Sequence, residues 1–210
     1  METFDHFIHK LKTQLTNPLP GQNSQMKMSP ITRKMELDKI KRGRKARESA
    51  VLILFYPHQN ETFTVFIKRP TYPGVHSGQV AFPGGKFEEE DQTLITTALR
   101  EAHEEIGIIP KEVYLLGKLT KLFIPPSNFN VLPVLAYLKK RPEFISDPFE
   151  VDEIIEVKLD QLLNPVNNQT REILHRSQKM VKVPAYCVNE QIIWGATAMI
   201  INELIEVIKS

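Results

Sequence analysis

The amino-acid sequence predicts an α/β (α+β) fold in which helices cover a mixed β-sheet. Apolar runs typical of strands precede, separate and follow helix-like segments along the 210 residues, which is the order expected for a mixed sheet with helices on its faces. The run over 50–56 is continuously apolar, as in a strand buried on both faces. The helix-like segment over 91–106 is followed by Gly107, a residue type that commonly caps helix C-termini. We expect an N-terminal helical arm and basic connector over 1–45 and one larger domain over 46–210 that includes a C-terminal helix.

The composition is that of an ordinary globular chain and argues against several classes of protein. Hydrophobic residues make up 41% and charged residues 25%, and a chain of this length buries about 70% of its unfolded surface, enough for a core without disulfides or structural metal. The net charge, 27 − 25 = +2, argues against a nucleic-acid partner or a polybasic membrane protein. Cys187 is the only cysteine, which fits a reducing compartment, so we expect a cytoplasmic protein. No apolar run approaches the ~20 residues of a membrane span, and the Met1 end lacks the apolar core of a signal peptide.

The N-terminal part divides into a helix and a polar segment. An amphipathic helix is predicted over 2–15, and the prolines and glycine of 17–21 end it. The apolar positions of this helix are Phe4, Ile8, Leu11 and Leu15. Residues 22–47 are polar, with eight Lys/Arg between Arg33 and Arg47. This basic run is either a solvated connector or a rim that attracts a phosphorylated ligand.

The remaining elements follow from the alternation of apolar runs and turn residues. After the first strand, the polar turn over 58–61 predicts a hairpin whose second strand covers 62–68. A short strand over 79–82 leads into a glycine-rich loop, Pro83-Gly84-Gly85, ahead of the helix. Beyond that helix we expect strands over 114–123, 131–138 and 153–159, a short helix over 160–163, one or two strands within 171–193, and a final helix from Trp194 to Ile208.

Glycines and acidic residues concentrate in one stretch of the chain. Five of the nine glycines lie between positions 74 and 107, and seven of the 25 acidic residues lie between Glu88 and Glu105. These glycines are Gly74, Gly78, Gly84, Gly85 and Gly107. Glycine permits tight turns and close approach of the backbone to an anion. The stretch therefore combines special backbone geometry with concentrated negative charge.

Helical periodicity places three of these carboxylates on one face. At about 100° per residue, Glu104 and Glu105 fall at about −60° and +40° from Glu101, within an arc of roughly 100°. A separate apolar stripe consists of Ile95, Ala98, Leu99, Ala102 and Ile106. Like charges at this spacing destabilise a helix by a few tenths of a kcal/mol per pair, and a divalent cation that prefers carboxylate oxygens, Mg²⁺ or Mn²⁺, would remove that cost. An ordinary solvated acidic face is the alternative, and the glycines on both sides of the helix favour the metal site.

The stretch that begins at Gly85 resembles the Nudix box, written G-x5-E-x7-R-E-U-x-E-E-x-G-U with U apolar. Its second half, R-E-A-H-E-E-I-G-I from Arg100, matches at every fixed position. Asp91 stands where the box has its first glutamate, with one additional residue before Arg100. Upstream, G-Q-V-A-F-P-G-G from Gly78 resembles the ending of the motif that marks Nudix coenzyme A pyrophosphatases, which tend to carry the same insertion. Gly74 stands where that motif has an arginine.

The resemblance implies a Nudix-like α/β/α sandwich and a reaction. Coenzyme A or acyl-coenzyme A would be hydrolysed at its diphosphate into 3′,5′-ADP and (acyl-)4′-phosphopantetheine, with Mg²⁺ or Mn²⁺ as cofactor. The implied partner is a small nucleotide substrate resembling coenzyme A, with no nucleic acid and no membrane, and a homodimer is compatible with it. One alternative is a Nudix pyrophosphatase for ADP-ribose, NADH or a dinucleotide. Another is a catalytically silent nucleotide-sensing module, against which the intact acidic cluster argues.

The resemblance also implies roles for particular residues. The predicted metal ligands are three carboxylates and one backbone carbonyl, those of Glu101, Glu104, Glu105 and Gly85. The three glutamates together with Arg100, which would orient one of them, form the predicted catalytic set. Gly84 and Gly85 are predicted to bind the substrate. Arg69 either binds a phosphate of the substrate or is a surface arginine at the end of a strand, and the surface position is slightly favoured. The general base varies between subfamilies and stays open, with Glu101 as one candidate.

Several polar residues outside the box have two interpretations each. Substrate contact and an ordinary polar loop explain the following about equally well: His76, Gln79, Ser127 and Asn128. Glu150, Asp152 and Glu153 either supply a further ligand or base or form a solvated edge, and the solvated edge is favoured. Trp194 is expected in the core rather than stacked on a base. His103 falls at about 200° on the helix, off the carboxylate face, and is expected to be non-catalytic.

Overall fold

The computed structural model describes residues 2–33, 37, 45–174 and 179–210. Along the chain, its helices and strands are α1 Phe4–Gln14, α2 Gly21–Gln25, η1 Met26–Met28, β1 Arg47–His58, β2 Glu61–Lys68, β3 Val80–Ala81, β4 Gly84–Lys86, η2 Glu89–Asp91, α4 Leu94–Ile106, η3 Pro110–Glu112, β5 Tyr114–Lys118, β6 Leu122–Ile124, β7 Phe129–Tyr137, β8 Glu153–Lys158, α5 Leu159–Leu163, η4 Pro165–Asn167, β9 Asn168–Leu174, β10 Met180–Val188, β11 Gln191–Trp194 and α6 Gly195–Lys209.

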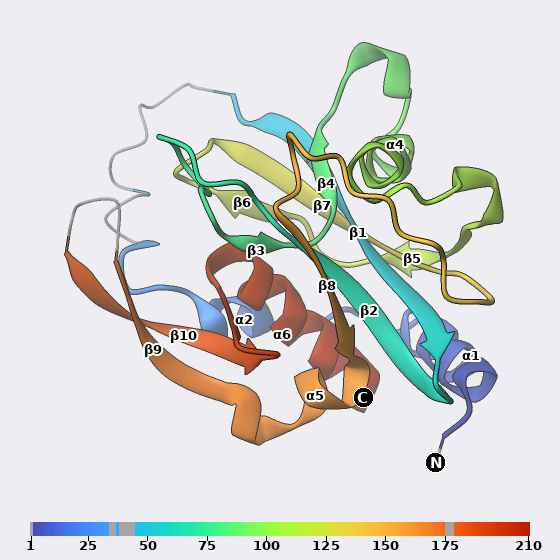
Figure 1. Ribbon diagram of the computed structural model, residues 1–210. Helices are drawn as coiled ribbons and strands as arrows, with labels where there is room; N and C mark the ends of the chain where they lie inside the picture. The colour runs from blue at the N-terminus through green and yellow to red at the C-terminus, as the bar shows by residue number, and fades with distance from the viewer. Residues whose placement is uncertain (1, 34–36, 38–44, 175–178) are drawn as a thin grey trace.

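A mixed sheet with helices on its two faces confirms the predicted fold class. The eight-stranded sheet has the order β3-β2-β1-β7-β5, and β4, β6 and β8 pair with β1, β7 and β2. Figure 1 shows α4 and α6 on different sides of this sheet, with the antiparallel sheet of β9, β10 and β11 beside α6. Among the described residues, no helix has both the length and the hydropathy that a membrane crossing requires.

The strand β1 lies at the centre of the sheet and separates two hydrophobic cores. It runs parallel to β7 and antiparallel to β2, so both of its edges are paired. Successive side chains of a strand point to opposite faces. Ile53 and Phe55 therefore pack with residues of α1 and α6, whereas Leu52 and Leu54 pack with residues of α4. All four side chains are fully buried, which explains the continuously apolar sequence of this strand.

Capping groups set the two ends of the acidic helix α4. The side chain of Thr93 accepts a backbone N–H of the first turn, so the helix begins after this residue and not at Asp91 as predicted. Asp91 belongs instead to the preceding turn η2. Gly107 ends the helix in the left-handed region at φ 74°, which confirms the predicted cap. The buried face of the helix includes Ala98, Ala102 and Ile106.

Three predictions about strands are wrong. The segment over 114–123 forms two strands, β5 and β6, which pair with different parts of β7. The segment over 171–193 contributes to three strands, because β9, β10 and β11 form two successive antiparallel pairs. Gly84 and Gly85 belong to strand β4, antiparallel to β1, where the sequence predicts a loop. Gly84 adopts φ 153°, a value that favours glycine. Residues with a side chain would not readily adopt the backbone conformation that β4 has at this position.

The N-terminal segment packs on the C-terminal helix α6. The side chains of Ser24, Gln25 and Met28 are buried, so the first part of the polar segment over 22–47 is packed, ahead of the basic run. Asn202 of α6 donates to the carbonyl and the hydroxyl of Ser24, both at 2.9 Å. Of the basic run, residues 34–36 and 38–44 lie outside the described residues, and the role of that run stays a prediction.

Glu203 of α6 is fully buried and holds this N-terminal segment in place. Its carboxylate accepts hydrogen bonds from the backbone N–H of Gly21 and of Thr120, both at 3.2 Å, and from Nε2 of Gln25 at 2.7 Å. Glu203→Ala would remove the acceptor of two partly buried backbone N–H groups, at about 1–3 kcal/mol each, whereas Nε2 of Gln25 keeps its bond to the carbonyl of Thr120 at 2.9 Å. We expect the free energy of unfolding in urea to fall by at least about 2 kcal/mol.

The matched control for Glu203→Ala is Glu153→Ala. Glu153 is half exposed, and its carboxylate lies 3.9 Å from Nζ of Lys68. Exposed pairs of this kind contribute at most about 1 kcal/mol. Equal losses of stability in the two variants would show that the buried carboxylate does not anchor the segment.

Candidate active site

A large cavity opens where β4 and the acidic helix α4 meet. Its volume is about 1170 Å³, above the ~300–1,000 Å³ of most small-molecule pockets. Residues on its wall come from the start of β1, the connection between β2 and β3, the turn between β6 and β7, and the start of α6. The cavity therefore suits an extended ligand that touches several elements at once.

Three carboxylates gather at one side of this cavity. Glu101 and Glu105 lie one turn apart on α4, and Glu150 comes from the segment before β8. Oxygen atoms of the three side chains lie within 4.8 Å of one another. Such a set of hard oxygen donors fits Mg²⁺ or Mn²⁺. Like charges this close destabilise one another unless a cation lies between them.

Glu105 is the most buried member of this cluster. Its side chain is 1% exposed, its Oε2 accepts the backbone N–H of Gly84 at 2.7 Å, and its Oε1 lies 3.8 Å from Nη1 of Arg69. Burial raises the pKa of Glu105 to about 8. The hydrogen bond from Gly84 and the positive charge of Arg69 lower this pKa, but by less than burial raises it. The β4 glycine thus binds the carboxylate directly through its backbone.

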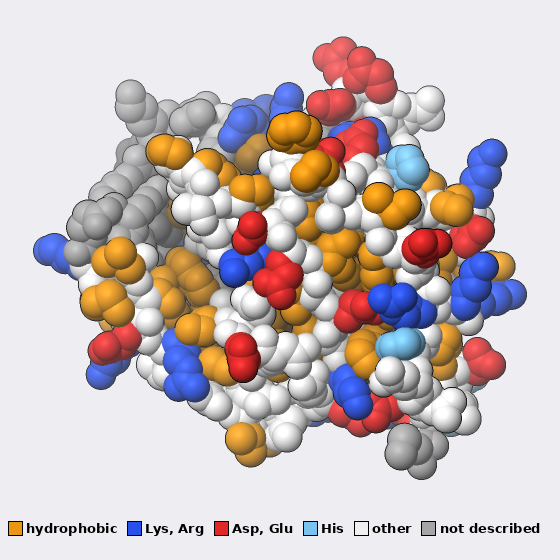
Figure 2. Space-filling model, in the orientation of Figure 1, with side chains coloured by type: hydrophobic (Ala, Val, Ile, Leu, Met, Phe, Trp, Pro, Cys, Tyr) orange, Lys and Arg blue, Asp and Glu red, His pale blue; other side chains and the backbone are white. Residues whose placement is uncertain are grey.

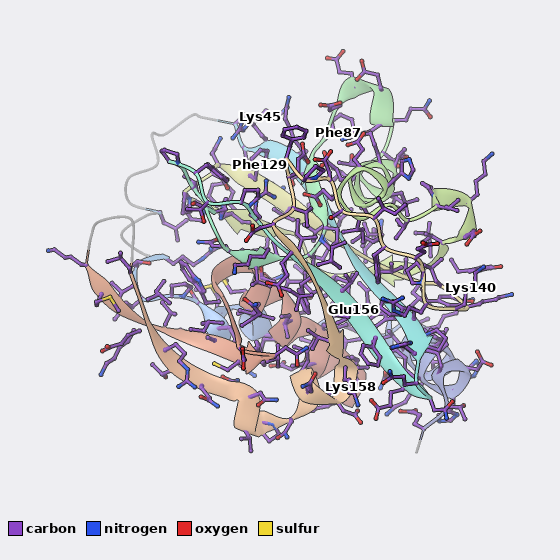
Figure 3. All side chains as sticks on the ribbon, viewed as in Figure 1. Lys45, Phe87, Phe129, Lys140, Glu156 and Lys158 are labelled. Atoms are coloured by element: carbon purple, nitrogen blue, oxygen red, sulfur yellow. The ribbon has the colours of Figure 1, made fainter. Side chains whose placement is uncertain are left out.

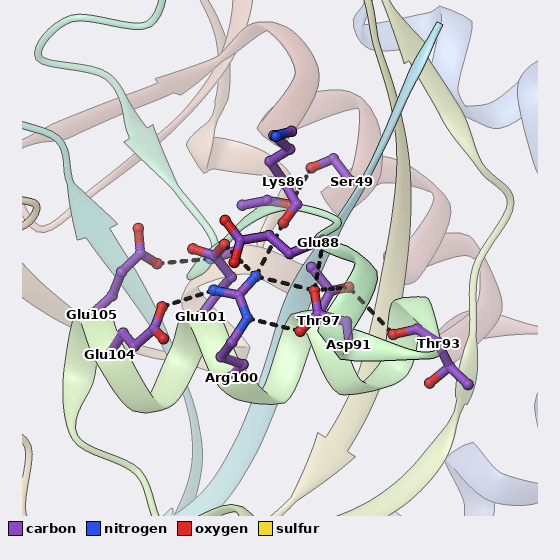
Figure 4. Close-up of polar contacts among 12 residues, drawn as sticks. Ser49, Lys86, Glu88, Asp91, Thr93, Thr97, Arg100, Glu101, Glu104 and Glu105 are labelled. Carbon is purple, nitrogen blue, oxygen red and sulfur yellow. Dashed lines mark hydrogen bonds and ion pairs between the residues drawn. The ribbon is translucent and has the colours of Figure 1, made fainter.

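Arg100 forms the second layer of the site (Figure 4). Its guanidinium donates to the carboxylates of Asp91, Glu101 and Glu104 at distances of 2.8–2.9 Å. The bond to Arg100 lowers the pKa of the buried Asp91 to about 2, and Thr97 donates to the same carboxylate at 2.9 Å. Asp91 therefore fixes the guanidinium, which in turn orients Glu101 toward the cavity.

Glu101 has a raised pKa because its side chain is desolvated, while Arg100 works in the opposite direction. Gly85 lies directly against it: a Cβ at this position would overlap the Glu101 carboxyl group. The carbonyl of Gly85 accepts the hydroxyl of Ser49 at 2.6 Å. Only a residue without a side chain leaves room here for the Glu101 carboxylate in its observed position.

The predicted site residues differ in where the structure places them. Arg69, Gly84, Gly85, Glu101 and Glu105 all line the cavity. Glu104 lies outside the three-carboxylate cluster, with its half-exposed carboxylate paired to Arg100 at 2.8 Å.

The structure also places the residues for which the sequence leaves two interpretations open. Cavity wall positions are taken by His76, Gln79, Ser127, Asn128 and Glu150. Glu153 instead pairs with Lys68, and Nδ1 of His103 lies 2.7 Å from the carbonyl of Ile108, away from the cavity.

A cationic part of the cavity wall comes from Arg47, which ends the basic run, and from Lys86, which sequence reasoning did not single out. The guanidinium of Arg47 lies 4.1 Å from the centroid of the Phe129 ring and donates to the carbonyl of Ser127 at 2.9 Å. Lys86 lines the same cavity. Figure 3 labels Lys45 near Phe129, at the same end of the sheet. In the sequence Arg47 is the last member of the basic run, and only the parallel pairing of β1 with β7 places it opposite Phe129.

The metal-free protein is expected to lose stability as the pH rises from about 4.5 to about 8. In this range the buried Glu105 keeps its proton, whereas the unfolded chain has released it, so each pH unit lowers the free energy of unfolding by up to ~1.4 kcal/mol. Urea unfolding in EDTA across this range measures the slope. Glu105→Gln should flatten it, and an unchanged slope in that variant would contradict the assignment.

Comparisons with known proteins complete this picture. A family model described as the NUDIX domain matches residues 46–177. A protein named Nudix hydrolase NudL from Pectobacterium atrosepticum is 36% identical over 158 residues, which cover 75% of this chain and 81% of the relative. The protein of the same name from Yersinia pestis (strain Pestoides F) is 37% identical over 158 residues, which cover 75% of this chain and 78% of the relative.

Two solved structures share the fold. RenU, a Nudix hydrolase from M. smegmatis, matches with a TM-score of 0.56 at 17% identity, covering 78% of this chain and 86% of its own. A MutT/nudix family protein from Enterococcus faecalis matches with a TM-score of 0.50 at 14% identity. The match covers 90% of this chain and 73% of that protein. At these sequence identities the two structures support the fold and nothing beyond it.

Proposed function

Because the chain belongs to the Nudix family and is a pyrophosphohydrolase, we propose that it hydrolyses the diphosphate bond of coenzyme A or an acyl-coenzyme A. The products would be 3′,5′-ADP and (acyl-)4′-phosphopantetheine. One observation carries the choice of substrate: the F-P-G-G segment that resembles coenzyme A pyrophosphatases forms cavity wall beside the carboxylates. Phe82, Gly84 and Gly85 all line the cavity. The ring centroids of Phe82 and Phe66 lie 4.6 Å apart.

The donor set of the site supports Mg²⁺ or Mn²⁺ as the cofactor. Glu101 and Glu105 would hold the cation, with Glu104 and the carbonyl of Gly85 as further ligands once Glu104 leaves Arg100. A bound cation of this kind neutralises the diphosphate, lowers the pKa of a bound water and stabilises charge on the leaving oxygen. The three-carboxylate cluster fits this role because it gathers oxygen donors of three side chains in one place, where Arg69 approaches Glu105 and Arg100 pairs with Glu101.

The side chains of the cavity divide the remaining tasks. We assign Arg69 the binding of a substrate phosphate, because its Nη1 lies 3.8 Å from Oε1 of the buried Glu105 and its guanidinium lines the cavity. Glu150 is exposed and comes from a loop, so we assign it the acceptance of the proton from the attacking water. Arg100 keeps Glu101 oriented and does not itself touch the substrate.

A panel of substrates tests this proposal. The protein with Mg²⁺, and separately with Mn²⁺, is incubated with coenzyme A, ADP-ribose, NADH and dinucleotides, and the products are separated by chromatography. We expect coenzyme A to give 3′,5′-ADP and 4′-phosphopantetheine with the highest kcat/KM, and EDTA to stop the reaction. Turnover of ADP-ribose with coenzyme A untouched would refute the substrate assignment.

One observation favours a second candidate, a pyrophosphatase for another nucleoside diphosphate compound. The motif of the coenzyme A enzymes has an arginine where this chain has Gly74. In the structure, a Cβ on Gly74 would lie 2.5 Å from Cε2 of Tyr72, so the tyrosine ring fills the space of a side chain. The Tyr72 hydroxyl donates to the carbonyl of Val75 at 2.8 Å, which fixes the ring there. The same substrate panel distinguishes the two candidates.

A further inference from the structure

Two cationic side chains lie next to each other at one end of the cavity. Alternate residues of a strand point to the same face, and Arg47 and Ser49 of β1 both line the cavity. Lys86 of β4 is the cross-strand partner of Ser49, so its side chain lies on that face too and lines the same cavity. Figure 4 shows the Lys86 side chain directed away from Arg100 and from the carboxylates that Arg100 binds. Arg47 and Lys86 are therefore diagonal neighbours on two paired strands, and we call them the cationic pair.

The neighbouring strand and turn hold Arg47 in place. Its guanidinium lies 4.1 Å from the centroid of the Phe129 ring, and its Nη2 donates to the carbonyl of Ser127 at 2.9 Å. Its backbone N–H donates to the carbonyl of Asn128, also at 2.9 Å. The bond to Ser127 uses one of the five N–H donors of the guanidinium, so the others can meet a ligand. A guanidinium that is already placed loses less conformational entropy when an anion binds to it.

Among the described residues, the cationic pair has no carboxylate partner. Arg69 and Arg100 form ion pairs with glutamates of the active site, whereas the ion pairs in the described part of the chain include neither Arg47 nor Lys86. Both side chains are exposed. Figure 2 shows Lys and Arg side chains gathered at the top of the molecule, over the start of β1 and beside β4. Positive charge that no acidic side chain balances attracts an anion to this end of the cavity.

The cationic pair lies a short distance from the place where the diphosphate would bind. The hydroxyl of Ser49 donates to the carbonyl of Gly85, and Gly85 lies against the Glu101 carboxyl group. Arg47 is two residues from Ser49, a step of about 6.6 Å along the strand. This step is comparable with the span of a ribose that carries phosphates on its 5′ and 3′ oxygens. A diphosphate at Glu101 and Arg69 would thus place a further phosphate of the same ribose near the cationic pair.

A phosphomonoester matches the cationic pair in charge and in shape. Near pH 7 it carries close to two negative charges and offers three acceptor oxygens. The guanidinium of Arg47 can bind two of these oxygens in parallel, and the ammonium group of Lys86 supplies the second positive charge. A ribose hydroxyl in the same place carries no charge, so a ligand without this phosphate gains much less from the two side chains.

We propose that Arg47 and Lys86 bind a phosphate on the ribose of the substrate, separate from the diphosphate, and that they select nucleotides that carry it. This inference rests on the proposed function, in which the 3′-phosphate of coenzyme A is that group. Neither residue belongs to the segment G-Q-V-A-F-P-G-G from Gly78, so the inference uses different residues from the proposal of the substrate. ADP-ribose and NADH have free hydroxyls on their riboses and are expected to be poor substrates.

Hydrolysis of coenzyme A and of 3′-dephospho-coenzyme A tests the selection. We expect kcat/KM to be at least about 25-fold higher for coenzyme A, and Arg47→Gln and Lys86→Gln each to lower this ratio about fivefold, because each removes one charge that meets the phosphate at an exposed site. The kcat/KM for 3′-dephospho-coenzyme A should stay at the wild-type value. Arg171→Gln and Lys111→Gln are the matched controls: both residues are exposed and neither lines the cavity, so the wild-type ratio should be retained.

Binding of products gives a readout that does not depend on hydrolysis. Isothermal titration calorimetry in EDTA compares 3′,5′-ADP with 5′-AMP, which differ only in the 3′-phosphate. We expect 3′,5′-ADP to bind more tightly to the wild type. The Arg47→Gln and Lys86→Gln variants should each lose about fivefold in affinity for 3′,5′-ADP and keep their affinity for 5′-AMP.

The possible results separate the cationic pair from the proposed function. Equal losses of kcat/KM for coenzyme A and 3′-dephospho-coenzyme A would mean that the pair attracts anions in general or binds the diphosphate, which overturns the inference and leaves the proposed function standing. Failure to hydrolyse coenzyme A, with 3′,5′-ADP still preferred through the two residues, upholds the phosphate site and overturns the proposed function. Turnover of ADP-ribose alone, with equal affinity for 3′,5′-ADP and 5′-AMP, overturns both.

Discussion

Glu105→Gln is expected to lower kcat by at least about 10²-fold while the protein stays folded. Second-layer residues of metal sites already cost about 10–100-fold when replaced, so a buried carboxylate in direct contact with the cation should cost more. Gln keeps the size of the side chain and loses the negative charge, and Glu105 is the member of the cluster with the least access to solvent. The measurement is steady-state hydrolysis over a range of Mg²⁺ concentrations, with circular dichroism to confirm folding.

The control for this substitution is Glu112→Gln. Glu112 is an exposed glutamate on the turn η3, just after the acidic helix, so its replacement changes the net charge by the same amount without touching the cavity. Its kcat should match that of the wild type. Full activity in Glu105→Gln, at any Mg²⁺ concentration, would remove Glu105 from the ligand set.

Glu150→Gln distinguishes proton transfer from metal binding within the same cluster. If Glu150 takes the proton from water, its loss should lower kcat by about 10²–10⁴-fold with little change in the Mg²⁺ concentration at half-maximal rate. If it binds the cation instead, that concentration should rise. Glu104→Gln gives the corresponding test for the predicted ligand that the structure shows paired with Arg100.

Glu105 and Glu150 also show which parts of this site can be predicted from the sequence and which cannot. Helix geometry is local, so the spacing of Glu101 and Glu105 alone places both carboxylates on one face. Glu150 is 45 positions beyond Glu105 along the chain and joins them through the pairing of β8 with β2, where Asp152 N–H donates to the carbonyl of Lys68 at 2.9 Å. No periodicity in the sequence encodes that pairing.

The fold shows the same division between local and non-local information. Long apolar or amphipathic segments such as β1 and α4 are predicted because a single strand or helix carries the whole pattern. The sheet of β9, β10 and β11 is half exposed, and Asn168–Leu174 has no buried residue, so its strands give only a weak apolar signal. The packing of Gln25 and Glu203 likewise joins the two ends of the chain, 178 positions apart.

Gly85→Ala is expected to abolish most activity without unfolding the protein. A Cβ on this residue would overlap the Glu101 carboxyl group, which is the end of a flexible side chain and can move aside. The free energy of unfolding should therefore change by no more than about 1 kcal/mol. The displaced carboxylate would no longer meet Arg100 and the cavity as it does now, and a shift of about 1 Å at a reacting centre can cost about 10²-fold in rate.

The neighbouring substitution Gly84→Ala should have the opposite profile, because there the added atom meets backbone rather than side chain. Its Cβ would collide with the carbonyl of Ala50 and lie 2.6 Å from Cα of Val51, at φ 153°. Backbone strain of this kind costs about 1–3 kcal/mol even before the collision is relieved by moving β1 or β4, so unfolding in urea should occur at clearly lower concentration. Comparing the two variants thus separates the two roles: Gly85 is needed for activity, and Gly84 is needed for stability. A Gly85→Ala protein with wild-type kcat would mean that the position of Glu101 seen here is not the one used in catalysis.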